Sequence, residues 1–574
     1  MTPPLPHPSA QPSLGRSLTG LWLLAIILAV VGLGQLPLRD WDEAIVARVA
    51  LEASQRPWPD RLLPTAWGDP YLNKPPGLHL LIAAAIEIWR ALSGAAPSAL
   101  PPEWLLRLVP ALLSSAVVPL VGLVQARLRP HQPAVALASA AMALTLMPLA
   151  RHGRLVMLDG SQLAAILVLW WAVLSPNHRR GSLLLHGACV GLATSALLLL
   201  KAPLAFPLLA ATLCLRAFDR QLHWRHWRWL LSGVAIGLLP GLAWHGAHLL
   251  VRGSDAWQMW GSQGFARLQA RLEGHNGGPL MPVTEVLEGG WPWLALWPGA
   301  MGLAWRERRS PAGRWCLGTT AITAVLVLPL RTQLPWYSLL LWPPLVLACG
   351  PALVWLVDRQ PPLQPAWPAL SRRIPAFWAL LGALLLALAL VAIATANTSL
   401  QPLAPVAASG GLALLVGGAL LLAKRPRRRQ SGAILLVAGL WGTLLVLMSG
   451  PLWLWELNEQ WPVRPIAKAV LQQPEGSARL WALEERPSLN WYAGQRLRRW
   501  EDDSLQTFLA KQGQADGTSM EQGSVVLVTA EPTPPELPGA RCQPLAVPQD
   551  GAAPPASARL YRCVRSQSPN QQKR

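Results

Sequence analysis

The chain has 574 residues, of which 52% are hydrophobic and only 14% are charged. Soluble domains carry about 25% charged residues, so this composition excludes an ordinary soluble protein and predicts one that crosses a membrane many times. The formal net charge of +20 does not indicate a nucleic-acid partner, because the arginines lie in short clusters between apolar runs, as in the cytoplasmic loops of membrane proteins.

Apolar runs of membrane-spanning length begin near the amino terminus. The run at about 18–36 has Arg16 before it and no small-residue cleavage site after it, which predicts an uncleaved first span after a cytoplasmic tail of residues 1–17. Further spans are predicted at about 105–126, 132–150, 160–175, 182–200, 202–217, 229–250, 291–305, 315–330, 336–357, 374–396, 403–423 and 432–450. The expected fold is an α-helical polytopic membrane domain over 18–451, with about thirteen transmembrane helices.

Basic clusters lie in every second loop between these runs. They are Arg127/Arg129, Arg179/Arg180, Arg220/Arg225/Arg228, Arg306/Arg308/Arg309/Arg314, Arg372/Arg373 and Lys424/Arg425/Arg427/Arg428/Arg429. The positive-inside rule places all of them in the cytoplasm, so the loops 37–104 and 251–290 and the tail after 451 face outward. An apolar segment at 77–89 would reverse this parity if it crossed the membrane. It is therefore predicted to be an interfacial or half-buried helix.

Three acids follow the first span, in Arg39-Asp40-Trp41-Asp42-Glu43. One interpretation is helix capping, because Asp40 and Glu43 have capping-box spacing before a helical run. The other is a catalytic carboxylate at the membrane surface. About thirty residues later Lys74 lies in Asn73-Lys74-Pro75-Pro76, where it either snorkels to the lipid headgroups or binds a phosphate.

Further polar residues interrupt apolar sequence on the predicted outer side. Asp159 either caps its span or serves a site, and Lys201 is either a loop lysine or a functional charge at the membrane. Arg331 and Tyr337 are either interfacial anchors or ligands for a substrate. His275 lies in the glycine-rich part of loop 251–290, which favours a site residue. One outer cavity that contains acids and bases would explain all of these residues.

The tail from 452 to 574 is more polar and predicts a small extracytoplasmic α/β domain. Strands are expected at 479–483, 524–529 and 559–564, and helices at 463–471 and 504–511. Cys542 and Cys563 lie in this tail and would pair if it is extracytoplasmic. The first fifteen and the last ten residues are expected to be disordered.

Taken in chain order, these motifs resemble those of the GT-C type membrane glycosyltransferases. The matching segments are Trp41-Asp42-Glu43, Asn73-Lys74-Pro75-Pro76, the turn ending in Asp159, Lys201-Ala202-Pro203 and Gln333-Leu334-Pro335-Trp336-Tyr337. The resemblance is to the bacterial group related to aminoarabinose lipid A transferase and to protein O-mannosyltransferases. It covers about 18–360 by motif and the whole chain by architecture.

The resemblance implies a glycosyltransferase that moves a sugar from a polyprenyl-phosphate carrier to a lipid A-like, glycan or protein acceptor. It also implies a bacterial inner membrane protein whose active site and carboxy-terminal domain face the periplasm. By resemblance the catalytic residues are Asp42, Glu43 and Asp159, and the residues that bind the phosphate or the substrate are Lys74, Lys201, Arg331, Tyr337 and His275.

Three positions depart from the family pattern, and at one of them, Ala202, many relatives have Gly. Some relatives have Glu, which can take part in a metal site, where this chain has Asn73; since Asn is a poorer ligand, we expect no metal and no other cofactor. Many relatives have Lys at Gln333, so phosphate binding there is expected to be weaker.

Two other functions are alternatives to a glycosyltransferase: a polytopic lipid or sugar transporter and a non-catalytic anchoring protein. The cytoplasmic loops contain no comparable set of acids, and no inverted repeat of broken spans is evident.

Overall fold

The computed structural model describes residues 13–175, 179–219, 222–270, 280–359, 370–395, 400–454, 463–472, 480–482, 485–499, 524–529, 540–545 and 559–565. The chain divides into two compact units. We call Met1–Gln35, Pro57–Pro64 and Pro70–Leu454 the helical unit, and Leu36–Arg56, Thr65–Asp69 and Trp455–Arg574 the loop–tail unit.

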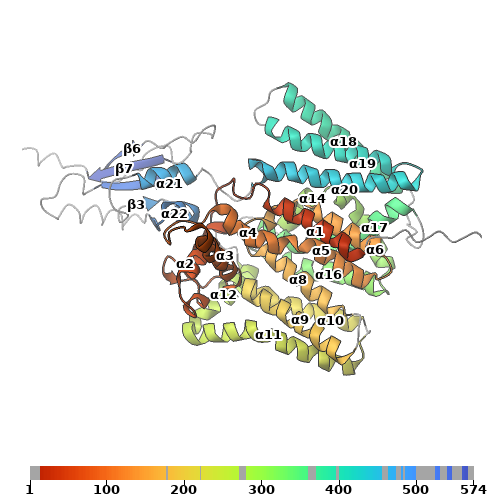
Figure 1. The fold of residues 1–574 in the computed structure, drawn as a ribbon, viewed down its shortest axis with the longest axis horizontal. Helices are drawn as coiled ribbons and strands as arrows, with labels where there is room; N and C mark the ends of the chain where they lie inside the picture. The colour runs from red at the N-terminus through yellow and green to blue at the C-terminus, as the bar shows by residue number, and fades with distance from the viewer. Residues whose placement is uncertain are drawn as a thin grey trace, which may run out of the picture. The chain divides into compact units, whose positions relative to one another are not determined.

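The helices of the helical unit follow the predicted spans (Figure 1). They are α1 (Leu14–Val30), α3 (Gly77–Ser93), α4 (Glu103–Ser115), α5 (Val117–Leu128), α6 (Pro133–Leu144), α7 (Met147–Gly153), α8 (Asp159–Val173), α9 (Arg180–Lys201), α10 (Ala205–Phe218), α11 (Trp224–Arg252), α12 (Gln258–Trp260), α13 (Ala266–Gln269), α14 (Met281–Gly289), α15 (Trp297–Arg306), α16 (Pro311–Val327), α17 (Trp342–Asp358), α18 (Leu370–Ala394), α19 (Ala404–Leu421) and α20 (Pro426–Ser449). Short helical turns join several of them: η1 (Asp60–Leu62), η2 (Ala202–Leu204), η3 (Gly253–Trp257), η4 (Gly261–Phe265), η5 (Trp293–Leu296), η6 (Pro335–Leu341), η7 (Gln401–Leu403) and η8 (Pro451–Trp453).

Every predicted span contains at least one helix. Among the described residues, seven helical segments are long and apolar enough to cross a membrane, or eight if α6 and α7 form one bent span. One of the seven, Arg180–Phe218, covers two predicted spans, and α1 and α8 are shorter apolar helices. The helical class is confirmed, while length and composition support fewer spans than the predicted number. The first helix begins at Leu14, inside the predicted tail 1–17.

The broken span has a local cause. Helices α6 and α7 meet at an angle of 59°, and Pro148 is the second residue of α7. Proline disfavours helical conformation in the residue before it and removes one amide donor, so the span bends here. Thr145 at the break is held by the indole of Trp293, whose Nε1 donates to the Thr145 hydroxyl at 2.9 Å.

Helices α9 and α11 approach closely because both present glycines at the contact. A Cβ atom on Gly187 would lie 2.1 Å from the carbonyl oxygen of Leu230, and one on Gly237 would lie 2.2 Å from that of Ala188. Small residues allow helix backbones to approach in this way within a membrane, where packing drives association. The three helices α18, α19 and α20 lie side by side in Figure 1.

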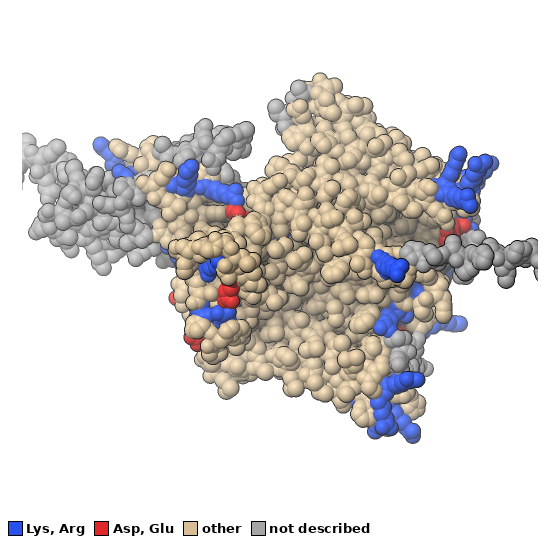
Figure 2. Space-filling view, viewed as in Figure 1, with Lys and Arg blue, Asp and Glu red and all other residues tan. Residues whose placement is uncertain are grey.

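Charged side chains are distributed unevenly over the helical unit. Lys424, Arg425, Arg427, Arg428, Arg308 and Arg309 are exposed. In Figure 2 the blue side chains of this unit gather at the helix ends, and a broad band of its visible face carries none. An uncharged band bounded by basic residues is the pattern expected of a helix bundle in a bilayer.

The loop–tail unit combines one helix of the predicted outer loop with a small α/β domain. It contains α2 (Glu43–Gln55), β1 (Thr65–Ala66), part of β2 (Asp69–Pro70), α21 (Val463–Leu471), β3 (Leu480–Ala482), α22 (Pro487–Ala493), β4 (Arg498–Arg499), β5 (Ser524–Thr529), β6 (Ala540–Leu545) and β7 (Arg559–Arg565). The tail sheet has the strand order β4-β3-β5-β7-β6. Strands β3, β4 and β5 are parallel, whereas β7 is antiparallel to β5 and β6.

These tail elements confirm most of the prediction for 452–574. The three predicted strands and the helix at 463–471 are present, while 504–511 lies outside the described residues. Helix α22 and strands β4 and β6 were not predicted. A disulfide joins Cys542 and Cys563, which face each other on β6 and β7.

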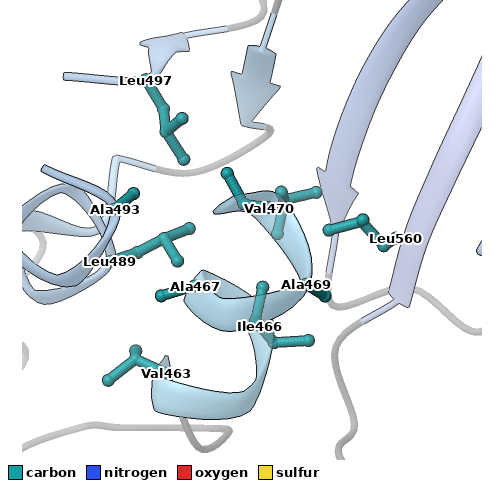
Figure 3. Close-up of a cluster of buried hydrophobic side chains, with 10 residues drawn as sticks. Val463, Ile466, Ala467, Ala469, Val470, Leu489, Ala493, Leu497 and Leu560 are labelled. Carbon is teal, nitrogen blue, oxygen red and sulfur yellow. The ribbon is translucent and has the colours of Figure 1, made fainter. Parts of the chain in front are cut away.

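The core of the tail domain lies where α21 and α22 pack on the sheet (Figure 3). Ile466 and Val463 on α21 are fully buried, as are Leu489 on α22 and Leu560 on β7. Each buried aliphatic side chain of this size contributes roughly 1.5–3 kcal/mol through removal from water. The cluster therefore fixes α22 to the sheet and makes the tail a folded body.

Replacing Ile466 with Ala should loosen this domain, because the change leaves a cavity in its core and costs about 2–5 kcal/mol. Hydrogen exchange of the full-length protein in detergent would show faster exchange of the α21 and β7 amides. Lys468→Ala on the exposed side of the same helix is the control and should leave exchange unchanged. Equal exchange in both variants would contradict this account of the core.

Candidate functional site

Lys201 forms an ion pair with Asp159 at the junction of α9 and η2. The backbone of Lys201 leaves helical conformation, with φ −149°, so α9 ends there. Its Nζ donates to Asp159 Oδ1 at 2.8 Å, and the two side chains are only 15% and 14% exposed. Asp159 is the first residue of α8, where the helix dipole favours a negative charge. The two residues that the sequence analysis treated separately therefore bind each other.

Tyr337 joins this pair to a second cation. The Lys201 ammonium lies over the Tyr337 ring, 4.9 Å from its centroid. On the other side Arg267 Nη1 donates to the Tyr337 hydroxyl at 2.8 Å. We call Asp159, Lys201, Arg267 and Tyr337 the Lys201 cluster. Its members come from α8, α9, α13 and η6, so four separate segments converge on one group of charges.

Arg267, rather than the predicted Arg331, lies in the Lys201 cluster. The side chain of Arg331 is exposed, whereas that of Arg267 is buried. The Arg331 backbone N–H donates to the Arg267 carbonyl oxygen at 2.9 Å, so Arg331 supports the segment that carries Arg267. Sequence reasoning missed Arg267 because it is one of several charges in loop 251–290. Its spacing in a short helix gave no signal.

Lys74 and its neighbours reach the same end of α9 through a glycine contact. A Cβ atom on Gly77, the first residue of α3, would lie 2.6 Å from the Leu199 carbonyl oxygen. This close approach brings the Lys74 turn to the part of α9 that ends in Lys201. His79 on α3 is buried, and its Nδ1 lies 3.0 Å from the Pro75 carbonyl oxygen. Burial and the positive charge of Lys74 lower the pKa of His79 to about 4, so the imidazole is neutral at physiological pH.

Gln333 has a structural role in this region. Its Nε2 donates to the carbonyl oxygens of Val327 at 3.1 Å and Leu330 at 2.7 Å. These carbonyls belong to the end of α16 and the turn after it, where helical partners are missing. Gln333 therefore satisfies backbone acceptors in this region, and weaker phosphate binding there stays a prediction.

Asp42 and Glu43 belong to the loop–tail unit and are described separately. Asp42 directly precedes α2 and makes no side-chain capping bond to it. Glu43 is fully buried, and its Oε2 accepts the backbone N–H of Arg39 at 3.0 Å. Helix capping was one of the two interpretations of these acids. Glu43 bonds back to the helix entry, while Asp42 at the N-cap position makes no side-chain capping bond. Its burial favours a supporting role for Glu43 over direct contact with substrate.

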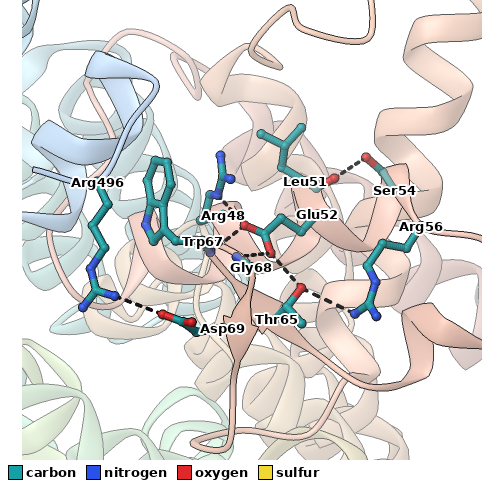
Figure 4. Close-up of polar contacts among 10 residues, drawn as sticks. All are labelled: Arg48, Leu51, Glu52, Ser54, Arg56, Thr65, Trp67, Gly68, Asp69 and Arg496. Carbon is teal, nitrogen blue, oxygen red and sulfur yellow. Dashed lines mark hydrogen bonds and ion pairs between the residues drawn. The ribbon is translucent and has the colours of Figure 1, made fainter. Parts of the chain in front are cut away.

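Glu52 ties the far end of α2 to the β1–β2 turn (Figure 4). Its carboxylate accepts Arg48 Nε at 2.7 Å, the Thr65 hydroxyl at 2.7 Å and the Trp67 backbone N–H at 2.6 Å. Arg48 also lies over the Trp67 ring at 3.7 Å. A carboxylate with this many donors rigidifies the outer loop that runs on toward Lys74. Glu52 gave no sequence signal because single acids on helices are common.

His275 and a metal ion are the two remaining subjects of the sequence analysis. His275 lies outside the described residues. Among those that are described, no group of three or more His, Cys, Asp or Glu side chains is arranged to hold a metal. Asp159 directs a carboxylate oxygen to the Lys201 ammonium, and Asn73 supplies only an amide. An amide oxygen carries no charge and is a weaker ligand than a carboxylate, and the expectation of no metal stays a prediction.

Two solved structures align with nearly the whole chain. ArnT from Cupriavidus metallidurans bound to undecaprenyl phosphate gives a TM-score of 0.66 at 17% identity, covering 96% of this chain and 98% of that one. Its apo form gives 0.65 at 18% identity, covering 95% and 97%. This chain has the ArnT fold. The fold class predicted from the ordered motifs is thereby confirmed.

More distant comparisons add little. The oligosaccharyltransferase of Archaeoglobus fulgidus in the apo form aligns with a TM-score of 0.40 at 14% identity, covering 81% of this chain and 59% of that one. That likeness is too low to support an argument. No protein-family model and no curated protein sequence matches the chain.

Gly77→Ala tests the contact that brings Lys74 to the end of α9. The new methyl group would overlap the Leu199 carbonyl, and overpacking of this kind typically costs about 1–3 kcal/mol. We expect a lower thermal midpoint in detergent for this variant. Gly246→Ala in α11, where a Cβ would meet nothing within 4 Å, should keep the wild-type midpoint or raise it. Equal midpoints for the two variants would show that Gly77 is not tightly packed.

Proposed function

We propose that this protein is a membrane glycosyltransferase that uses a polyprenyl-phosphate-linked sugar. The Lys201 cluster is the observation on which the proposal rests, because it gathers two cations, an acid and a phenol at the junction of several apolar helices. The fold supports the same conclusion, since ArnT was solved with undecaprenyl phosphate bound. A lipid phosphate is the ligand that such cations recognise beside a membrane.

Lys201 and Arg267 are proposed to bind the phosphate of the carrier, with Lys74 as a further cation. During transfer the bond between the anomeric carbon and the phosphate oxygen breaks, and the phosphate leaves with the electron pair. Fixed cations stabilise that developing negative charge strongly in a site from which water is excluded. Tyr337 orients Arg267 through its hydroxyl and Lys201 through its ring, and Asp159 holds Lys201 in place.

Asp42 is proposed to act as the base. The acceptor oxygen forms the new bond to the anomeric carbon, and its proton passes to the Asp42 carboxylate. Asp42 is half-buried, whereas its neighbour Glu43 is fully buried, so the two acids have different environments. We assign proton transfer to Asp42 and helix entry to Glu43. The donor set described above leads us to propose that the reaction needs no divalent metal.

The proposed location is a bacterial inner membrane, with the site and the tail domain in the periplasm. The basic loops on one side support this orientation. The Cys542–Cys563 disulfide supports it independently, because such bonds persist in oxidising compartments. The acceptor is proposed to be a lipid A-like molecule, a glycan or a protein; the described residues favour none of the three.

Asp42→Asn tests the catalytic assignment. In cells lacking the protein, mass spectrometry of envelope glycolipids and glycoproteins would identify the missing product, and wild-type protein should restore it. The variant should fail to restore it, since removal of a general base typically costs about 10²–10⁴-fold in rate. Its binding of a polyprenyl phosphate should remain normal. Full restoration by the variant would refute the role of Asp42.

Arg267→Gln and Arg331→Gln form a matched pair that tests the phosphate site. Loss of a charge-assisted hydrogen bond costs about 1.5–3 kcal/mol, so Arg267→Gln should weaken binding of a polyprenyl phosphate by roughly 10- to 100-fold. Arg331→Gln should change it by less than about threefold, because the Arg331 side chain is exposed. Titration of the purified variants in detergent measures both constants. The reverse order would return the phosphate to Arg331.

A further inference from the structure

Asp40 is buried in a contact between the outer loop and the tail domain. Its side chain is within the loop–tail unit, and the whole residue is 7% exposed. One carboxylate oxygen accepts Arg486 Nε, and the other accepts both the backbone N–H and the hydroxyl of Ser488. The Ser488 N–H donates at 2.9 Å. Arg486 and Ser488 are themselves buried at 6% and 0% exposure. We call these three residues the Asp40 clamp.

The clamp holds the turn from which Asp42 projects. The backbone N–H of Asp42 donates to the Asp40 carbonyl oxygen at 2.6 Å, so the two residues share one tight turn. Trp41 between them has φ 55°, in the left-handed region, and is 56% exposed. A non-glycine residue in that region costs about 1–3 kcal/mol and persists only where its surroundings hold it. The clamp on Asp40 and the bond from the Arg39 N–H to Glu43 both act on this turn.

The other half of the clamp is part of the tail-domain core. Arg486 is the residue before α22, and Ser488 is the second residue of that helix. Leu489 and Ala493 of α22 belong to the buried cluster of the tail domain. A second hydrogen bond also joins α22 to the outer loop: the Leu38 backbone N–H donates to the Tyr492 hydroxyl at 2.7 Å. The Asp42 turn is thus attached to a folded body through several adjacent bonds.

We propose that the tail domain is a positioning element for catalysis and that Asp40, Arg486 and Ser488 are positioning residues for Asp42. This inference rests on the proposed function, because it concerns the carboxylate that function makes the base. A misplacement of about 1 Å in a catalytic group can cost about 10²-fold in rate. The polar clamp sets direction as well as distance, since its bonds approach Asp40 from two residues. The tail domain thereby contributes to the reaction without touching a substrate.

The test uses the purified full-length protein with a polyprenyl-phosphate sugar and its acceptor. Asp40→Asn and Arg486→Gln should each lower kcat by about 10- to 100-fold and leave KM for the lipid-linked sugar unchanged. The acidic limb of the pH–kcat profile should shift in both variants, because the environment of Asp42 changes. The variant that combines Asp40→Asn with Arg486→Gln should have a higher kcat than the worse single variant. In the combined variant neither position keeps a buried charge without its partner.

A matched control is available in the same unit. Arg496 contacts Asp69 at 3.3 Å and Glu485 at 3.4 Å, but its side chain is 51% exposed. Arg496→Ala removes a contact between the tail and the outer loop without reaching the Asp42 turn. It should change kcat by less than about twofold. Hydrogen exchange of α21 should match wild type in every variant, which shows that the tail domain remains folded.

The outcomes separate this inference from the proposed function. Wild-type kcat and pH profiles in Asp40→Asn and Arg486→Gln, with Asp42→Asn inactive, would overturn the positioning role and leave the function intact. Loss of α21 protection in all clamp variants, including the double variant, would also overturn it, because the clamp would then serve folding alone. Activity in Asp42→Asn would overturn the function and the inference together.

Discussion

The ion pair between Lys201 and Asp159 is the interaction on which this site depends. A lone ammonium group at the end of an apolar helix costs several kcal/mol, and α9 ends in Lys201 after four consecutive leucines. The acid at the start of α8 offsets that cost, and Tyr337 and Arg267 complete the group. The four charged or polar side chains come from four separate segments. The cluster therefore forms only when the helices of the bundle pack correctly.

The proposed chemistry draws on both units of the chain. In that proposal, cations of the helical unit bind the lipid phosphate and Asp42 of the loop–tail unit accepts the proton. Lys201 and Arg267 are held by bonds to Asp159 and Tyr337, as pre-organised catalysis requires. The outer loop alone would be a poor support for the proposed base, because loops are mobile. Hydrogen bonds from Asp40 to Arg486 and Ser488 attach that loop to the folded tail domain and restrict its motion.

Much of this could be predicted because membrane sequence is constrained by the bilayer. The length of the apolar runs predicted the helices. The alternation of arginine clusters predicted which loops share the outer side. Asp159, Lys201 and Tyr337 were selected as exceptions within apolar sequence, and they meet in the structure. An ionisable group within a membrane span costs free energy, so it is rare and easily recognised in the sequence.

Residues on polar segments were harder to predict. Arg267 lies among other charges in loop 251–290, and its partnership with Tyr337 spans 70 positions. The Asp40 clamp joins residues more than 440 positions apart, and α22 is too short for a periodic signal. A capping box was one interpretation of Asp40, because local spacing allowed it. Its actual partners depend on tertiary contacts, which spacing does not reveal.

A structure of the protein with a polyprenyl phosphate bound would test the central claim most directly. The account predicts phosphate density within hydrogen-bond distance of the Arg267 guanidinium, with Lys201 or Lys74 as a second cation. Phosphate density bound elsewhere, with Arg267, Lys201 and Lys74 all out of reach, would contradict the account.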